Sequence, residues 1–173
     1  MRTTAVSLAL LALAATGVRA EEAQPLAGPD TQFLAKAIQD GMAEVDLGKT
    51  AEKKASSPEV KRFAERMVKD HGAANQKLEA LAKKHKIEAQ GTYGTPPLKP
   101  DEQAKAEKAD LSKLSGKEFD QAYAKEMVQD HEKAVGLFQD EAKNGKDKEV
   151  SQVAGSLLPT LQEHLKMAQG LAK

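Results

Sequence analysis

Hydrophobic residues recur every three to four positions through most of this chain, which is the period of an amphipathic helix. Four long stretches carry the pattern, and we predict helices over residues 31–55, 58–85, 116–144 and 148–172. The residue before each stretch is a preferred N-cap. The second stretch also has a proline at its first helical position, and the third begins with a capping box. These four caps are Asp30, Ser57, Ser115 and Asp147.

The connections between the predicted helices indicate how the helices are arranged. Only two or three residues join the first helix to the second and the third to the fourth, so each pair must lie antiparallel. Residues 87–100 are rich in glycine and proline and predict a loop, and residues 101–113 predict a short polar helix. The sequence therefore predicts an all-α antiparallel four-helix bundle with a long connection between helices 2 and 3.

The first twenty residues have the features of a bacterial signal peptide. Met1-Arg2 is positively charged, an apolar run covers residues 5–15, and Val18-Arg19-Ala20 ends in small residues at the cleavage positions. We predict cleavage after Ala20 and a periplasmic or secreted protein without membrane insertion, because the run is too short to span a bilayer. Residues 21–30 are then a disordered lead-in, and residues 31–172 form the bundle domain.

Composition limits the partners and the ligand chemistry. Loss of Arg2 and Arg19 with the signal peptide leaves 24 basic and 26 acidic residues, a net charge of −2. This balance gives no general attraction to nucleic acid or to an anionic membrane, and it identifies no protein partner. The chain has no cysteine, so a metal site would have to be built without thiolate ligands.

Three of the predicted helices place a histidine in the middle of an apolar face. The first two lie in the same local string, Met-Val-x-Asp-His, which ends at His71 and at His131, and the third is His164. Glu44 falls within the apolar face of the remaining helix. Counting from the turns at a rise of about 1.5 Å per residue places all four near the middle of the bundle, where bundles build metal and cofactor sites.

Two interpretations of this cluster remain open at this point. A carboxylate and three imidazoles suit a transition metal ion such as zinc, copper or iron. Alternatively, the same groups form a buried hydrogen-bonded network without metal, in which the carboxylate neutralises one imidazolium. The candidate metal ligands are Glu44, His71, His131 and His164, and candidate outer contacts or soft ligands are Asp70, Asp130, Tyr123, Met67 and Met127.

The motifs also carry a family resemblance. The two Met-Val-x-Asp-His strings, Phe119-Asp120-x-x-Tyr123 and Leu158-Pro159-x-Leu161-x-x-His164 resemble a bacterial exported family of unknown function whose members often bear the label outer membrane protein. The resemblance implies a ferritin-like four-helix bundle but no biochemical activity. The Glu-x-x-His motif of di-iron proteins is missing, because Val68, Val128 and Leu161 stand three residues before the histidines.

Three function classes therefore follow from the sequence. The first is an exported metal-binding bundle, and the second is a structural or stress-related envelope protein with a metal-free histidine network. The third and weakest is a metal-dependent redox enzyme, so we expect a protein that is not an enzyme. Oligomeric state and physiological process are not encoded in any motif of the chain.

Overall fold

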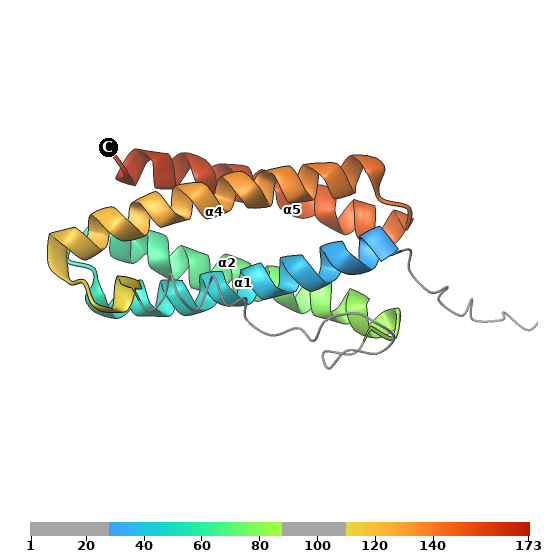
Figure 1. Ribbon diagram of the computed structural model, residues 1–173, viewed down its shortest axis with the longest axis horizontal. Coiled ribbons are helices and arrows are strands. Elements are labelled where there is room, and N and C mark those ends of the chain that lie inside the picture. The colour runs from blue at the N-terminus through green and yellow to red at the C-terminus, as the bar shows by residue number, and fades with distance from the viewer. Residues whose placement is uncertain (1–27, 88–109) are drawn as a thin grey trace, which may run out of the picture.

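The computed structural model describes residues 28–87 and 110–173, and these ranges fold into a bundle of long helices (Figure 1). The long helices are α1 (Gly28–Lys54), α2 (Pro58–Lys84), α4 (Gly116–Asn144) and α5 (Lys148–Leu171). Helices α1 and α2 form one antiparallel hairpin, and α4 and α5 form a second that packs against the first. The predicted all-α antiparallel four-helix bundle is confirmed.

The connection between α2 and α4 is described only at its two ends. The predicted loop over residues 87–100 lies outside the described residues except for Ile87, and the predicted helix over 101–113 lies outside them up to residue 109. Residues 110–112 are helical and lead into α4. No helix in the described part of the chain is both long enough and apolar enough to cross a membrane.

Two of the predicted caps act as expected. The Ser57 hydroxyl accepts hydrogen bonds from the first backbone N–H groups of α2, and the Asp147 carboxylate does the same for α5. Ser115 makes no side-chain cap. The next residue, Gly116, has a φ of 59°, so the chain enters α4 through a left-handed conformation that glycine tolerates.

The prediction for Asp30 was wrong. Helix α1 begins at Gly28, two residues before Asp30, which places this aspartate inside the first turn. Its carboxylate instead accepts the backbone N–H groups of Lys146 and Asp147 at 2.9 and 3.0 Å, in the turn between α4 and α5. A carboxylate next to two backbone N–H groups of a turn can satisfy both of them.

Asp120 makes the matching contact at the other end of the bundle. This residue lies in α4, and its carboxylate accepts the backbone N–H groups of Ser56 and Ser57 in the turn between α1 and α2, at 3.0 and 2.9 Å. Each hairpin therefore sends an aspartate from its first helix to the turn of the other hairpin. These two contacts fix the hairpins against each other at both ends.

The apolar core is divided into two clusters with a polar layer between them. One cluster lies around Phe33 and Phe138, where α1 begins and α4 ends, and the other lies around Phe63 and Phe119 at the opposite end. Along each of the four helices, one buried titratable residue separates the two clusters. This layer consists of Glu44, His71, His131 and His164.

Candidate metal centre

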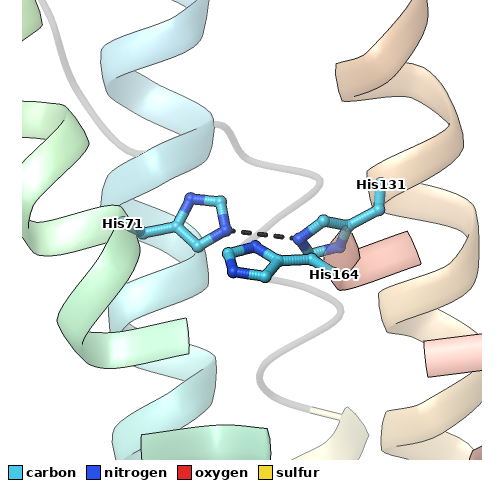
Figure 2. Close-up of side chains that lie close together, drawn as sticks. All are labelled: His71, His131 and His164. Carbon is cyan, nitrogen blue, oxygen red and sulfur yellow. Dashed lines mark hydrogen bonds between the residues drawn. The ribbon is translucent and has the colours of Figure 1, made fainter. Parts of the chain in front are cut away.

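Three imidazole rings converge in the polar layer from three different helices (Figure 2). His71 comes from α2, His131 from α4 and His164 from α5, and the three ring centroids lie 5.3 to 5.4 Å apart. The Nε2 atoms of His71 and His131 are 3.2 Å apart. One nitrogen from each ring lies within 4.8 Å of the nitrogens offered by the other two.

The contact of His131 with its own helix determines which nitrogen it offers. Its Nδ1 lies 2.8 Å from the carbonyl oxygen of Met127, one turn earlier in α4. A carbonyl can only accept, so Nδ1 carries the hydrogen and donates it. In the neutral ring, the lone pair is then on Nε2, which points at His71.

His164 is oriented by a side chain from the neighbouring helix. Its Nε2 donates to Asp70 Oδ2 at 3.0 Å, and its Nδ1 is buried without a hydrogen-bond partner. Arg66 donates through Nε to the same carboxylate oxygen at 3.1 Å and forms a two-point ion pair with Glu163 at 2.8 and 3.0 Å. This chain of contacts leaves the lone pair of His164 on Nδ1, inside the polar layer.

The environment keeps all three rings uncharged near neutral pH. Burial lowers the pKa of His71 well below 6.5, and the neighbouring imidazoles lower it further. Burial lowers the pKa of His131 to about 4. The pKa of His164 is also lowered by burial, although the Asp70 carboxylate opposes this shift. Neutral imidazoles are the form that binds metal ions.

Asp70 is ionised in this arrangement. Burial by itself would raise the pKa of its carboxyl group, but hydrogen bonds from His164 and Arg66 outweigh that effect, and the net pKa is lowered. An ionised carboxylate that accepts from a histidine N–H is the usual outer partner of a metal-binding imidazole, because it fixes the ring and makes its other nitrogen more basic.

The donor set fits a tetrahedral transition metal ion. Metal to imidazole nitrogen distances of about 2.0–2.1 Å place two ligands of a tetrahedron about 3.3 Å apart. The Nε2 atoms of His71 and His131 already lie at 3.2 Å. The buried Nδ1 of His164, with no hydrogen-bond partner, supplies a third lone pair, and the nitrogens offered by the three rings lie within 4.8 Å of one another.

The fourth predicted ligand, Glu44, lies in the same layer but approaches from a different side. The residue is only 6% exposed, and its Oε1 is 3.9 Å from His131 Nδ1. That nitrogen already donates to Met127, so the carboxylate faces the back of the ring and is not in the group of converging nitrogens. The structure thus brings three of the four predicted ligands together.

The predicted outer residues divide into two groups. Asp70 contacts the cluster, whereas Asp130 pairs with Lys133 at 3.1 Å, the lysine-paired arrangement typical of a boundary carboxylate. The core cluster around Phe63 and Phe119 contains the other three residues, which are fully buried there: Tyr123, Met67 and Met127. The ring of Tyr123 stacks on Phe119. Their side chains therefore belong to the packing of that cluster.

Sequence reasoning did not select Arg66 or Glu163. Arg66 stands four residues before Asp70 on the same helix, a spacing at which opposite charges meet. The ion pair between these two residues could therefore have been predicted from the sequence. Glu163 precedes His164 and meets Arg66 across the interface between α5 and α2. That contact depends on how the hairpins pack and has no local signature.

Sequence comparison places the chain in a family. The profile of the domain of unknown function DUF4142 matches residues 15–171. The chain belongs to this family. This confirms the resemblance to a family of unknown function, and no curated protein matches the sequence.

Several solved structures share the fold. A DUF305 fragment from Deinococcus radiodurans superposes with a TM-score of 0.71 at 20% identity, covering 86% of this chain and 98% of that one. CopM in its Cu(II)-bound form has a TM-score of 0.65 at 15% identity, covering 83% and 95%. CopM in an Ag-bound form gives 0.62 at 17%, covering 82% and 92%. At these identities the similarity establishes the fold alone.

Proposed function

We propose that this DUF4142 protein binds a single transition metal ion through His71, His131 and His164. One observation carries the proposal: two of the rings have their outer nitrogen fixed as a donor, so their lone pairs point into a buried layer shared with the third ring. The partnerless Nδ1 of His164 is costly to bury unless a ligand satisfies it. A metal ion is the ligand whose chemistry suits three neutral imidazoles.

The protein's own residues would position the site. Arg66 and Asp70 hold His164, and the Met127 carbonyl holds His131. His71 comes from the first hairpin and the other two rings from the second, so a bound ion would also tie the hairpins together. Without metal, His71 Nε2–H can donate to His131 Nε2, which keeps those two rings together.

Copper is the ion we favour, with zinc as its main competitor. A site made only of imidazoles suits Cu(II) and Zn(II), whereas Fe sites of bundles draw on several carboxylates. The Cu(II)-bound and Ag-bound CopM structures support this choice by their shared fold. We further propose that the protein acts in the periplasm or outside the cell after cleavage behind Ala20.

A metal-free role is the second candidate, supported by the hydrogen bond between His71 and His131 and by the network from Asp70 to Glu163. In that case the cluster fixes the register of the hairpins in an envelope protein and needs no ion. Metal content of protein purified from its native compartment separates the two candidates.

The decisive experiment titrates the chelator-stripped protein beginning at Glu21 with Cu(II) and Zn(II). We expect one-to-one binding and a higher unfolding midpoint, because the ion binds only the folded state. His71→Ala and His131→Ala should each weaken binding by about 100-fold or more, since removing one of three ligands leaves an incomplete site. His85→Ala, at the end of α2 and away from the cluster, is the matched control.

Absence of any midpoint shift for either ion at tenfold excess would contradict metal binding and leave the metal-free network as the function of the cluster.

A further inference from the structure

A cavity of about 620 Å³ lies directly beside the histidine cluster. His71, His164 and Glu44 line it at the level of the histidine layer, which we call the polar end. Leu78, Phe138 and Leu157 line it one helix repeat away, together with Lys77, and we call this the apolar end. This volume falls in the range of pockets that bind small molecules.

The shape of the cavity follows from the helix repeat. Leu78, Phe138 and Leu157 each stand seven residues, or about 10 Å along a helix, from His71, His131 and His164. Between these two layers the lining residues include the small side chains of Gly41, Ala74 and Ala134. Two layers of large side chains separated by a layer of small ones leave an elongated hollow.

Asn75 is a buried polar residue in the lining of this hollow. It lies one turn beyond His71 in α2, is only 8% exposed, and its Oδ1 has no hydrogen-bond partner. Gly41 makes room for the amide, because a Cβ at that position would lie 2.1 Å from Asn75 Oδ1. A buried amide in a cavity wall can hydrogen-bond a bound molecule, and it donates to an acceptor such as a carboxylate through its Nδ2–H group.

The charges around the cavity indicate the charge of that molecule once metal is bound. Four basic and four acidic side chains line it, so their formal charges cancel. A divalent ion at the polar end would make that end positive. The complementary ligand then has an anionic head and an apolar body. The charged lining residues are Lys36, Arg66, Lys77, Lys133, Asp40, Glu44, Asp70 and Asp130.

We propose that the cavity binds a small aliphatic carboxylate, with its head at the metal-bearing end within reach of Asn75 and its chain against Leu78, Phe138 and Leu157. This inference rests on the proposed metal binding and adds a ligand class to the same site. With a metal ion held by the three imidazoles, one carboxylate oxygen would take the remaining ligand position, and the Asn75 Nδ2–H group would donate to the other oxygen.

Calorimetric titration of the Zn-loaded protein with acetate, butyrate and hexanoate tests the proposal. Each methylene group moved into the apolar end should tighten binding about fourfold, so hexanoate should bind far more tightly than acetate. The chelator-stripped protein should bind hexanoate at least tenfold more weakly. Equal affinity of the stripped and loaded forms would overturn the orientation of the head toward the metal.

Substitutions at two positions locate the ligand. Ala134→Phe fills the middle of the cavity from α4 and should abolish hexanoate binding, while Ala134→Ser, which keeps the volume, should not. Asn75→Leu, which is close in size, should weaken acetate and hexanoate about tenfold through loss of the amide. Cooperative thermal unfolding and zinc affinity within threefold of the parent establish that all three variants fold.

The two levels of the proposal fail differently. Zinc binding without any preference for the longer carboxylate, or hexanoate binding unchanged by Ala134→Phe, overturns the cavity inference and leaves metal binding standing. Failure to bind zinc or copper overturns both.

Discussion

The two Met-Val-x-Asp-His strings have the same local sequence, but only their histidines, and not their aspartates, make corresponding contacts. In both, the histidine enters the cluster, and His71 and His131 meet at 3.2 Å. Their aspartates differ: Asp70 accepts from His164 and Arg66, whereas Asp130 pairs with Lys133. The string determines the face on which each side chain lies, and the neighbouring helix determines what that side chain meets.

The difference begins one residue before the string. Arg66 precedes the first string and Glu126 precedes the second, so only Asp70 has a cation one turn earlier on its own helix. The adjacent helices differ as well. In the first string the aspartate, Asp70, meets an imidazole of the adjacent helix α5, that of His164. In the second string the histidine, His131, meets a carboxylate of the adjacent helix α1, that of Glu44. A carboxylate can orient an imidazole only where an imidazole faces it.

Acidification should produce the largest effect, and it acts on the histidines, which both strings place in the cluster. The pKa values of the three buried histidines lie below 6.5 in the folded state, so the unfolded chain takes up protons first as the pH falls. The free energy of unfolding of the metal-free protein should fall between pH 6.5 and about 4, by about 3 kcal/mol for a ring with the pKa of His131.

Urea unfolding of the metal-free protein at several pH values measures this loss. His131→Gln should flatten the profile, because glutamine does not titrate. An equally steep profile in His131→Gln would mean that this ring is not buried in its neutral form.

Metal affinity should distinguish the two aspartates. Asp70→Asn removes the charged acceptor that orients His164, and we expect about 10- to 100-fold weaker copper or zinc binding. Asp130→Asn is the matched control at the same position of the second string and should change affinity less than threefold. Competition with a chromophoric chelator measures both. Equal losses in the two variants would show that Asp70 has no special role.

Much of the fold could be predicted from the sequence because it depends on local signals. Hydrophobic period, proline and cap residues predicted α2 and α5 to within one or two residues, and turns of a few residues required antiparallel pairs. The level of the three histidines followed from the constant rise of a helix. The start of α1 was not predicted correctly, because Asp30 accepts hydrogen bonds from the turn of the other hairpin and does not cap α1.

Parts of the site depend on contacts between hairpins, and no local pattern encodes these. The contact of Glu44 with the back of His131 depends on how α1 packs against α4. The pair between Arg66 and Glu163 depends on how α2 packs against α5. The cavity depends on small residues of α1, α2 and α4 falling in one layer, which only the assembled bundle reveals.

A second buried group must be separated from the histidines before their pH profile can be interpreted. Burial, assisted by the charges of Asp30, Asp140 and Asp147, raises the pKa of Glu141 to about 7. The unfolded carboxyl loses its proton first, so this group stabilises below about pH 4.5 and loses that contribution as the pH rises to 7, opposite in sign to the histidines. Glu141→Gln should therefore raise stability at pH 8 by about 1 kcal/mol after solvent screening, measured by urea unfolding.

The same substitution should have little effect at pH 4.5, where the parent carboxyl is also protonated. A gain of equal size at both values would indicate a packing effect in place of titration.

The methionines of the two strings should have the smallest effect on metal binding and show the least difference between strings. Met67 and Met127 are both 0% exposed and lie in the apolar cluster with Phe63 and Tyr123, so their thioethers fill core volume. Met67→Leu and Met127→Leu conserve that volume and should each cost less than about 1.5 kcal/mol. Copper affinity, measured for Cu(II) and for Cu(I) under reductant, should stay within twofold in both variants, because the imidazoles supply the ligands. Loss of Cu(I) binding with Zn(II) binding intact would instead assign the thioethers to the site, since thioether ligands select Cu(I) and not Zn(II).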